Sequence, residues 1–385
     1  MKAKQVGSLL VAAAMLMTAA TGCAAGDKVE KVLKIGGIGP TTGAAAVYGE
    51  AVKNGAEIAL EEINAKGDLK FELKFEDDEN DAETAVNAYN NLKDWGMQML
   101  VGTVTSNPCT AVVEQTHNDN MFQLTPSGSA IESIKYDNAF RVCFSDPNQG
   151  VGAAQYIGQN NLAEKVAVIY NSSDVYSSGI YEKFAAEAAN QPFEVVAAEA
   201  FTDDSKTDFT VQLQKAKDAG ADLIFLPIYY QEASLILQQV AAMDYSPKFF
   251  GCDGLDGILA VENFDLSLAK GVMLLTPFAA DAQDDLTQKF VTSYQEKYGE
   301  VPNQFAADTY DAMYIIKAAA EKANVTPDMS VSDICDAMKV AMTEITYDGL
   351  TGTGMTWSAD GEPSKAPKAV VIDIAEDGTG SYKAM

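Results

Sequence analysis

The sequence predicts an α/β fold with two doubly wound lobes, each built on a parallel sheet that helices cover on both faces. Short, uniformly apolar segments alternate with helix-length segments along most of the chain, which is typical of buried parallel strands. The alternation forms two consecutive series, and no low-complexity linker divides them. A chain of 385 residues can bury two substantial cores. We therefore expect two lobes that several chain segments cross.

The first series has five strand-like segments. They lie at residues 33–38, 71–76, 97–102, 121–126 and 140–144. Residues 50–67 repeat apolar side chains on one helical face and predict a helix between the first two strands. Asp81 is expected to open the next helix. Asn107 is expected to cap a third, with Pro108 as its first residue.

The second series begins after Pro147 and repeats the same pattern. Its strand-like segments lie at residues 165–170, 193–201, 221–227, 248–251 and 271–278. A mainly helical region follows, from about Asp284 to Met342. Residues 369–378 supply a late strand. The helical region separates this late strand from the rest of its series, so the chain must cross between the lobes more than once.

The N-terminal segment has the layout of a secretory signal. Lys2 and Lys4 precede an apolar run at residues 9–20, which is short for a membrane span. The letters ATGC, which end at Cys23, resemble a bacterial lipobox, in which the cysteine is lipidated and becomes the mature N-terminus. We expect residues 1–22 to be a lipoprotein signal peptide and residues 23–31 a tether. The protein would then be extracytoplasmic and lipid-anchored to the bacterial cell membrane. Ordinary cleavage near Cys23 is the alternative.

Composition excludes several classes of function. The 27 basic and 55 acidic residues give a net charge of −28, which repels phosphate backbones, so we expect no nucleic-acid partner. His117 is the only histidine, which argues against a zinc site, and we expect no metal. Arg141 is the only arginine, so a buried ligand carboxylate must find other partners. Whether any of Cys109, Cys143, Cys252 and Cys335 pair is left open.

Catalytic and cofactor motifs are weak. The glycines near residue 37 depart from the dinucleotide-binding spacing, because Pro40 follows Gly39 and Thr42 stands where the third glycine belongs. We therefore expect no cofactor. A Ser-His-acid triad would need His117, which lies in a polar helix end and is expected to be a solvated surface residue. The acidic segment 76–83 lacks the alternating ligand spacing of a calcium loop.

Loops rich in hydroxyl or aromatic side chains recur at the carboxyl ends of strands. They are TVTSNPCT, TPSGSA, NSSDVYSSG, PIYYQEA and GCDGLDG. Ligands of open α/β sheets bind at these ends, where helix N-termini offer free N–H groups. Each loop alone is more often a helix cap. Five of them in two lobes predict a cleft.

From Val32 to about Gly378 the chain resembles the leucine/isoleucine/valine-type (type I) periplasmic binding proteins, the amino-acid receptors of ABC importers. The segments that carry the resemblance are IGGIGPTTGAAAVYG, TSNPCT, TPSGSA, VYSSG, PIYY, GCDG and FAADTYDA. The resemblance implies two Rossmann-like lobes joined by a three-crossing hinge. Lobe 1 would comprise residues 32–146 plus 280–354, and lobe 2 residues 147–279 plus 355–385.

The same resemblance implies a function and partners. The protein would be a binding protein and not an enzyme, and its ligands would be branched-chain or other apolar or aromatic amino acids. It would deliver them to the membrane subunits of an ABC permease and their ATPases, and it would act as a monomer.

Eight residues match the ligand site of the family. Ser106, Ser127 and Ser129 fall where the ligand α-carboxylate is held, and Asp253 falls where the α-ammonium is held. Aromatic residues fall where rings wall the ligand: Tyr48, Tyr176, Tyr229 and Phe305. The acid is Asp rather than the Glu of the branched-chain receptors, and Thr105 replaces a disulfide cysteine of some members, so that bond is not carried over.

The physics of a zwitterion agrees with this assignment. Both charges need partners when water is removed, and hydroxyls with helix N–H groups suit the carboxylate while an acid suits the ammonium. Asp256 is expected to cap the short helix after it and to lie outside the site. Two alternatives stay open: the same fold binding another solute, such as a short amide, urea or an aromatic acid, and an exported α/β enzyme with Asp253 as acid or base.

Overall fold

The computed structural model describes residues 31–67 and 69–385. The expected signal peptide, the expected lipidation site Cys23 and nearly all of the expected tether lie outside the described residues. Among the described helices, none combines the length and the apolar character that a membrane span requires.

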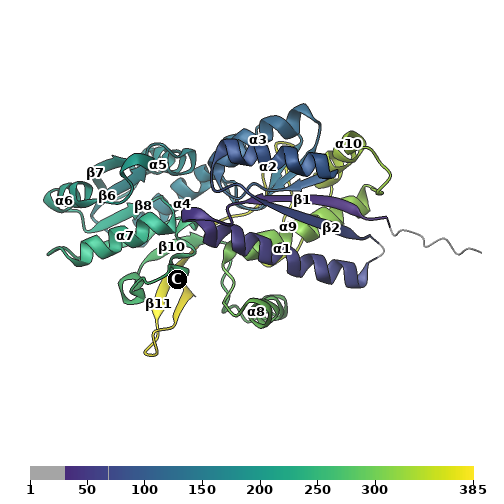
Figure 1. Ribbon diagram of the computed structural model, residues 1–385. Helices are drawn as coiled ribbons and strands as arrows, with labels where there is room; N and C mark the ends of the chain where they lie inside the picture. Colours follow the sequence, from purple (N-terminus) through teal and green to yellow (C-terminus); the bar gives the residue numbers. More distant parts are fainter. Residues whose placement is uncertain (1–30, 68) are drawn as a thin grey trace, which may run out of the picture. The chain divides into compact units, whose positions relative to one another are not determined.

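The first sheet has five parallel strands in the order β2-β1-β3-β4-β5 (Figure 1). Their bounds are β1 Leu33–Gly39, β2 Phe71–Asp77, β3 Met99–Val101, β4 Phe122–Thr125 and β5 Ala139–Arg141. All three residues of β3 and all four of β4 are buried, because these central strands have helices on both faces.

Helices from two distant parts of the chain cover the first sheet. Their bounds are α1 Ala46–Lys66, α2 Ala82–Trp95, α3 Ser106–Asn118, α8 Asp285–Tyr298, α9 Gln304–Lys322 and α10 Val331–Met342. Figure 1 shows α2 and α3 on one side of β1, and α1 and α9 on the other. A Cβ on Gly55 of α1 would lie 2.1 Å from the carbonyl oxygen of Ala306, so only glycine permits α1 and α9 to pack this closely.

The second sheet has seven strands in the order β12-β11-β10-β9-β8-β6-β7. Their bounds are β6 Lys165–Asn171, β7 Glu194–Phe201, β8 Leu223–Leu226, β9 Lys248–Gly251, β10 Met273–Thr276, β11 Lys368–Ile374 and β12 Gly380–Ala384. Strands β6 to β10 are parallel, whereas β11 and β12 add an antiparallel edge. The sequence predicted β11 but not β12, which follows it through a short turn.

Helices of the second series lie against the second sheet, with α5 and α7 on opposite sides of it (Figure 1). The bounds are α4 Asp146–Gln159, α5 Val175–Ala188, α6 Thr210–Asp218 and α7 Tyr230–Ala241. Short 3₁₀ turns complete the chain: η1 Gly43–Ala45, η2 Ile131–Ile134, η3 Asp203–Ser205, η4 Asp253–Leu255, η5 Ile258–Ala260 and η6 Leu266–Ala269.

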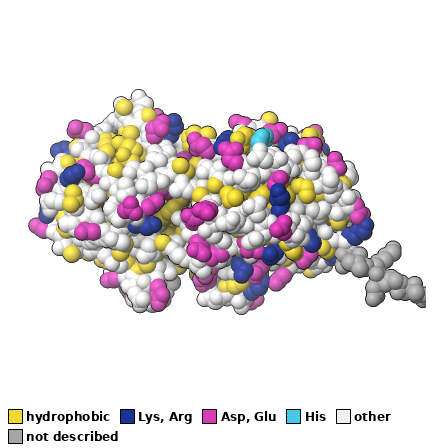
Figure 2. All heavy atoms as spheres, turned by 45° about the horizontal axis from the view of Figure 1, so that its top comes forward, with side chains coloured by type: hydrophobic (Ala, Val, Ile, Leu, Met, Phe, Trp, Pro, Cys, Tyr) yellow, Lys and Arg dark blue, Asp and Glu magenta, His cyan; other side chains and the backbone are white. Residues whose placement is uncertain are grey.

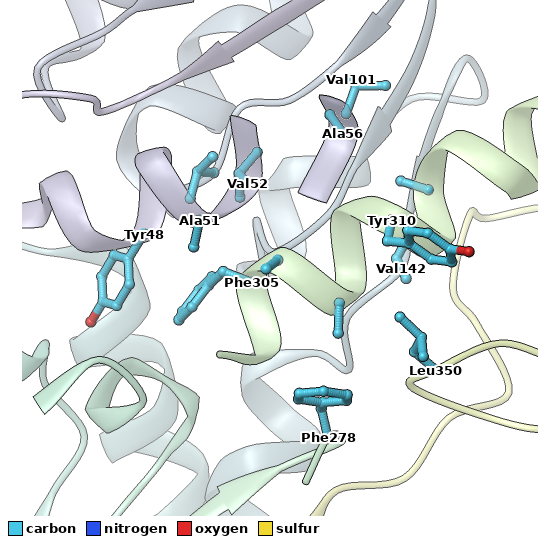
Figure 3. Close-up of a cluster of buried hydrophobic side chains, with 14 of the residues drawn as sticks. Tyr48, Ala51, Val52, Ala56, Val101, Val142, Phe278, Phe305, Tyr310 and Leu350 are labelled. Carbon is cyan, nitrogen blue, oxygen red and sulfur yellow. The ribbon is translucent and has the colours of Figure 1, made fainter. Parts of the chain in front are cut away.

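Three segments carry the chain between the two sheets. The first follows β5, the second follows β10 and leads to α8, and the third leads from α10 to β11. This is the three-crossing arrangement that the family resemblance implied, and the exact lobe boundaries stay a prediction. Figure 3 shows a buried apolar cluster beside the crossings, in which Tyr48 and Ala51 of α1 lie near Phe305 of α9.

A buried ion pair ties two of these crossings to α9. The ammonium of Lys365, in the third crossing, lies 2.7 Å from Asp308 Oδ1 of α9. Lys365 Nζ also donates to the hydroxyl of Thr351 at 2.7 Å and to the carbonyl oxygen of Val142, in the first crossing, at 3.2 Å. The ammonium thus has three acceptors for its three hydrogens.

The surface carries the acidic excess of the sequence. Figure 2 shows Asp and Glu side chains spread over the visible face, with Lys and Arg side chains between them. His117 is exposed and stacks on Tyr136, with 3.8 Å between the ring centroids. The histidine is therefore a surface residue, as the sequence predicted.

Candidate functional site

The eight residues expected at the ligand site line one cavity. They come from loops and helix starts that both sheets place at the carboxyl ends of their strands, and they are Tyr48, Ser106, Ser127, Ser129, Tyr176, Tyr229, Asp253 and Phe305. Val104, Thr105 and Gly254 complete the lining. The cavity has a volume of about 10 Å³, close to the space that one water needs. The structure therefore brings the eight together, while their role in binding stays a prediction.

Asp253 is a buried acid, only 4% exposed, in the turn after β9. Its Oδ1 accepts a hydrogen bond of 2.7 Å from the hydroxyl of Tyr176. Burial raises the pKa of Asp253 to about 7, against the opposing effect of the Tyr176 hydrogen bond. In the described part of the chain, no lysine or arginine forms an ion pair with it. A buried carboxylate without a cation is costly, so this position favours a ligand that brings one.

The backbone around Asp253 is held from three sides. Its N–H donates to the side-chain oxygen of Gln149 at 3.0 Å, and its carbonyl accepts from the side-chain nitrogen of Gln304 at 2.8 Å. The N–H of Gly254 donates to the hydroxyl of Tyr176 at 2.9 Å. Gln149 lies on α4, which follows the first crossing, and Gln304 lies at the start of α9, so two separate helices fix the acid in place.

Hydroxyl groups gather at the opposite wall of the cavity, where α3 begins. Ser106 Oγ accepts from the N–H of Ala130 at 3.2 Å, and Ser127 Oγ donates to the carbonyl of Val104 at 2.7 Å. The hydroxyl of Thr105, the N-cap of α3, is buried and has no hydrogen-bond partner in the described residues. Free N–H groups of a helix start and an unpartnered hydroxyl suit a carboxylate.

The single arginine supports the serine loop from behind. Arg141 is buried, and its Nη1 donates to the carbonyl oxygens of Gly128, Ser129 and Ala130. Its Nε lies 3.0 Å from Glu362. A Cβ on Gly128 would lie 2.9 Å from the sulfur of Cys109, so the loop also needs its glycine. Arg141 therefore shapes the loop and does not line the cavity.

Aromatic rings form the remaining walls. The Tyr48 and Phe305 rings lie 4.2 Å apart, and the Tyr176 and Tyr229 rings stack at 4.9 Å (centroid distances), with the first pair visible in Figure 3. The Tyr48 hydroxyl donates to the carbonyl of Gly254 and accepts from the N–H of Tyr230 at 3.2 Å. Burial raises the pKa of Tyr48 and of Tyr176 well above the ordinary value, so both phenols stay neutral.

Two capping predictions were wrong. Helix α3 begins at Ser106 with Thr105 as its cap, because Thr105 has extended backbone while Asn107 is already helical. The Asn107 side chain instead accepts from the N–H of Val175 at 3.3 Å, across the two sheets. Asp256 does not cap the short helix that follows it. It accepts at 2.8 Å from the N–H of Gln304, at the start of α9.

Three lining residues are not among those that the sequence predicted: Val104, Thr105 and Gly254. All three stand beside predicted site residues in the segments TVTSNPCT and GCDG, which was the available signal. The cysteines that the sequence left open, Cys109, Cys143, Cys252 and Cys335, are all buried and free.

The fold and this cleft define a class of solute-binding proteins. The chain belongs to the periplasmic binding protein family, whose family model matches residues 32–379. The fold is that of the type I members, and membership implies a place outside the cytoplasm.

Curated relatives match most of the chain. A Leu/Ile/Val-binding protein homolog 3 from Brucella melitensis is 29% identical over 77% of this chain and 80% of its own length. A leucine-, isoleucine-, valine-, threonine- and alanine-binding protein from Pseudomonas aeruginosa is 26% identical over 82% of this chain and 85% of its own.

Solved structures match the fold closely. The branched-chain amino acid transporter substrate-binding protein LivJ from Streptococcus pneumoniae, in complex with isoleucine, has a TM-score of 0.80. It is 26% identical, with 92% of this chain and 99% of that chain covered. A solute-binding protein from R. palustris in complex with benzoate has a TM-score of 0.79 at 20% identity, covering 92% of this chain and 96% of its own, and shows the fold alone.

Proposed function

We propose that this protein captures an α-amino acid in the cleft between its two lobes and delivers it to an ABC importer. One observation carries the proposal: Asp253, a buried carboxylate to which no described residue gives a cationic partner, lines the same cavity as the hydroxyls of Thr105 and Ser106 at a helix start. An α-amino acid supplies an ammonium for Asp253 and a carboxylate for the hydroxyls at the helix start. The names of the relatives, which are amino-acid-binding proteins, support it.

Capture requires movement of the lobes or of the rings. A cavity of about 10 Å³ cannot hold an amino acid, and Tyr48 joins the two sheets through Gly254 and Tyr230. The three crossing segments are the natural hinge, and a ligand that bridges both walls would favour the closed form. The protein has no chemical step in this account.

A thermal-shift panel tests the ligand class. The panel contains the standard amino acids, sugars, short amides, urea and aromatic acids. A ligand that binds only the folded form, at about 100 times its Kd, stabilises it by about 2.7 kcal/mol. We expect the largest shift from an amino acid. The proposal would be overturned if a sugar, an amide, urea or an aromatic acid gave the largest shift, although the fold assignment would stand. Chemical conversion of the best ligand would point to an enzyme.

The anchor is a separate part of the proposal and rests on the ATGC letters before the mature chain. A lipidated Cys23 would hold the protein at the membrane surface near the permease subunits and their ATPases. Cys23→Ser should move the protein from the membrane fraction to the soluble fraction of the expressing cells. If the variant stays in the membrane fraction without an acyl chain, the anchor assignment is wrong.

A further inference from the structure

A second, larger cavity adjoins the proposed site. Its volume is about 290 Å³, and Tyr229 lines both cavities. Asn107 and Glu79 reach it from the first-sheet side, and Asp174 and Glu232 from the second-sheet side. We call this cavity the outer chamber. It lies between the two lobes, so a ligand in it would contact both.

Glu232, in the first turn of α7, is the most unusual group of the outer chamber. It is only 7% exposed, and in the described part of the chain no other residue gives its carboxylate a hydrogen bond or an ion pair. Burial raises its pKa, and two effects oppose this: a hydrogen bond from the backbone N–H of Glu232 itself and the attraction of Lys206. Lys206 also lines the chamber, yet no ion pair within 4 Å joins it to Glu232. A buried carboxylate in this state favours a cationic or N–H-donating partner.

Other acids surround the same space. Asp174 is 6% exposed and is the N-cap of α5, where its carboxylate accepts from the N–H of Tyr176 at 3.3 Å. A backbone hydrogen bond from Ser177 also acts on this carboxylate. Glu79 and Asp203 also line the chamber, so four acids face one lysine. Within the described residues, no group of three or more acid, histidine or cysteine side chains is arranged to hold a metal ion. The charge therefore suits an organic cation.

The two cavities share one lining residue, Tyr229. Burial raises the pKa of the Tyr48 phenol, and the charges of Tyr230, Asp253 and Glu232 add to this effect. The Tyr229 ring lines both cavities, so a ligand side chain that extends from one cavity into the other would pack against this ring. A methylene chain packs well on such a surface while its charged end reaches further.

We infer that the side chain of the bound amino acid passes Tyr229 into the outer chamber and ends in a cationic group that Glu232 and Asp174 hold. The favoured ligands are then basic amino acids with an apolar stem, of the lysine, ornithine and arginine class. This inference rests on the proposed function and adds a terminal cation to the apolar side chain that the sequence suggested.

Lysine and norleucine test the inference on the unaltered protein, because they share the same stem and differ in the terminal ammonium. We expect calorimetric titration to show lysine binding roughly 10- to 100-fold more tightly, the range of a charge-assisted hydrogen bond. Norleucine or leucine binding as tightly as lysine, ornithine and arginine would overturn the inference and leave the proposed function standing. Binding of no amino acid would overturn both.

Glu232→Gln locates the effect. The variant keeps the shape of the side chain and should lower lysine affinity roughly tenfold while leaving norleucine affinity unchanged. Glu194→Gln, at an exposed position at the start of β7, is the matched control and should change neither. An unchanged lysine-to-norleucine ratio in Glu232→Gln would show that Lys206, not a ligand, neutralises Glu232. Stabilisation by Ca²⁺ or Mg²⁺ alone, lost in Glu232→Gln, would also overturn the inference.

Discussion

Removal of the Lys365 ammonium should destabilise the fold strongly. The side chains of Lys365 and Asp308 are each about 2% exposed, and Lys365 Nζ lies 2.7 Å from Asp308 Oδ1. Lys365→Met keeps the length of the side chain, leaves the Asp308 carboxylate buried without its cation, and removes the donor from Thr351 Oγ1 and Val142 O. Loss of one partner of a buried ion pair costs about 3–5 kcal/mol of unfolding free energy. We expect a loss of that size.

Urea denaturation followed by circular dichroism at pH 7 measures the loss. Lys339→Met is the matched control, because Lys339 is part-exposed and its ion pair with Asp137 should contribute less than about 1 kcal/mol. The double variant Lys365→Met, Asp308→Leu leaves no unpaired charge and should recover much of the stability. A Lys365→Met variant that loses no more than Lys339→Met would refute the reasoning.

Three further outcomes follow from the buried charges. Arg141→Lys should weaken amino-acid binding about tenfold in calorimetry, because a lysine side chain cannot bind the three carbonyl oxygens and Glu362 together. Unchanged binding would show that the serine loop needs no support from Arg141. Burial raises the pKa of Asp256 to about 6, so its contribution to stability is full below about pH 4 and is lost as the pH rises through 6. Between pH 4.5 and 7 the urea midpoint of Asp256→Asn should therefore fall less steeply than that of the parent protein. An equal dependence of the two midpoints on pH would contradict this. Since the pKa of Asp253 is about 7, ligand affinity should fall by up to about tenfold per pH unit below 7, and a flat profile from pH 5 to 8 would exclude its role.

Local patterns were sufficient to predict most strands and the place of the site. The apolar segment at 248–251 is β9 to the residue, and the strand expected at 33–38 is β1, Leu33–Gly39. Parallel strands bring the loops at their carboxyl ends together, which is why residues as distant as Tyr48 and Phe305 line one cavity. The parallel topology thus brings together the eight residues that the motifs indicated, and their role in binding stays a prediction.

Contacts between distant segments could not be predicted in the same way. Asp256 bonds the start of α9, which lies 48 residues further along the chain, and Asn107 bonds Val175, which lies 68 residues away. Local capping preference assigns both side chains to the nearest helix, but in the structure each of them bonds a backbone N–H that is distant in the sequence. Glu232 was missed for a related reason: only its burial and the chamber around it distinguish it from an ordinary first-turn acid.

Calorimetric titration of Asp253→Asn tests the central claim most directly. The ligand is the amino acid that gives the largest thermal shift, and Asp256→Asn, a buried acid of the same turn that does not line the site, is the control. Since the loss of one partner of a buried ion pair costs about 3–5 kcal/mol, Asp253→Asn should weaken binding by at least about 100-fold, with the circular dichroism spectrum unchanged. Asp256→Asn should bind within about threefold of the parent. Affinity of Asp253→Asn within about threefold of the parent would contradict the assignment of Asp253 as the ammonium partner.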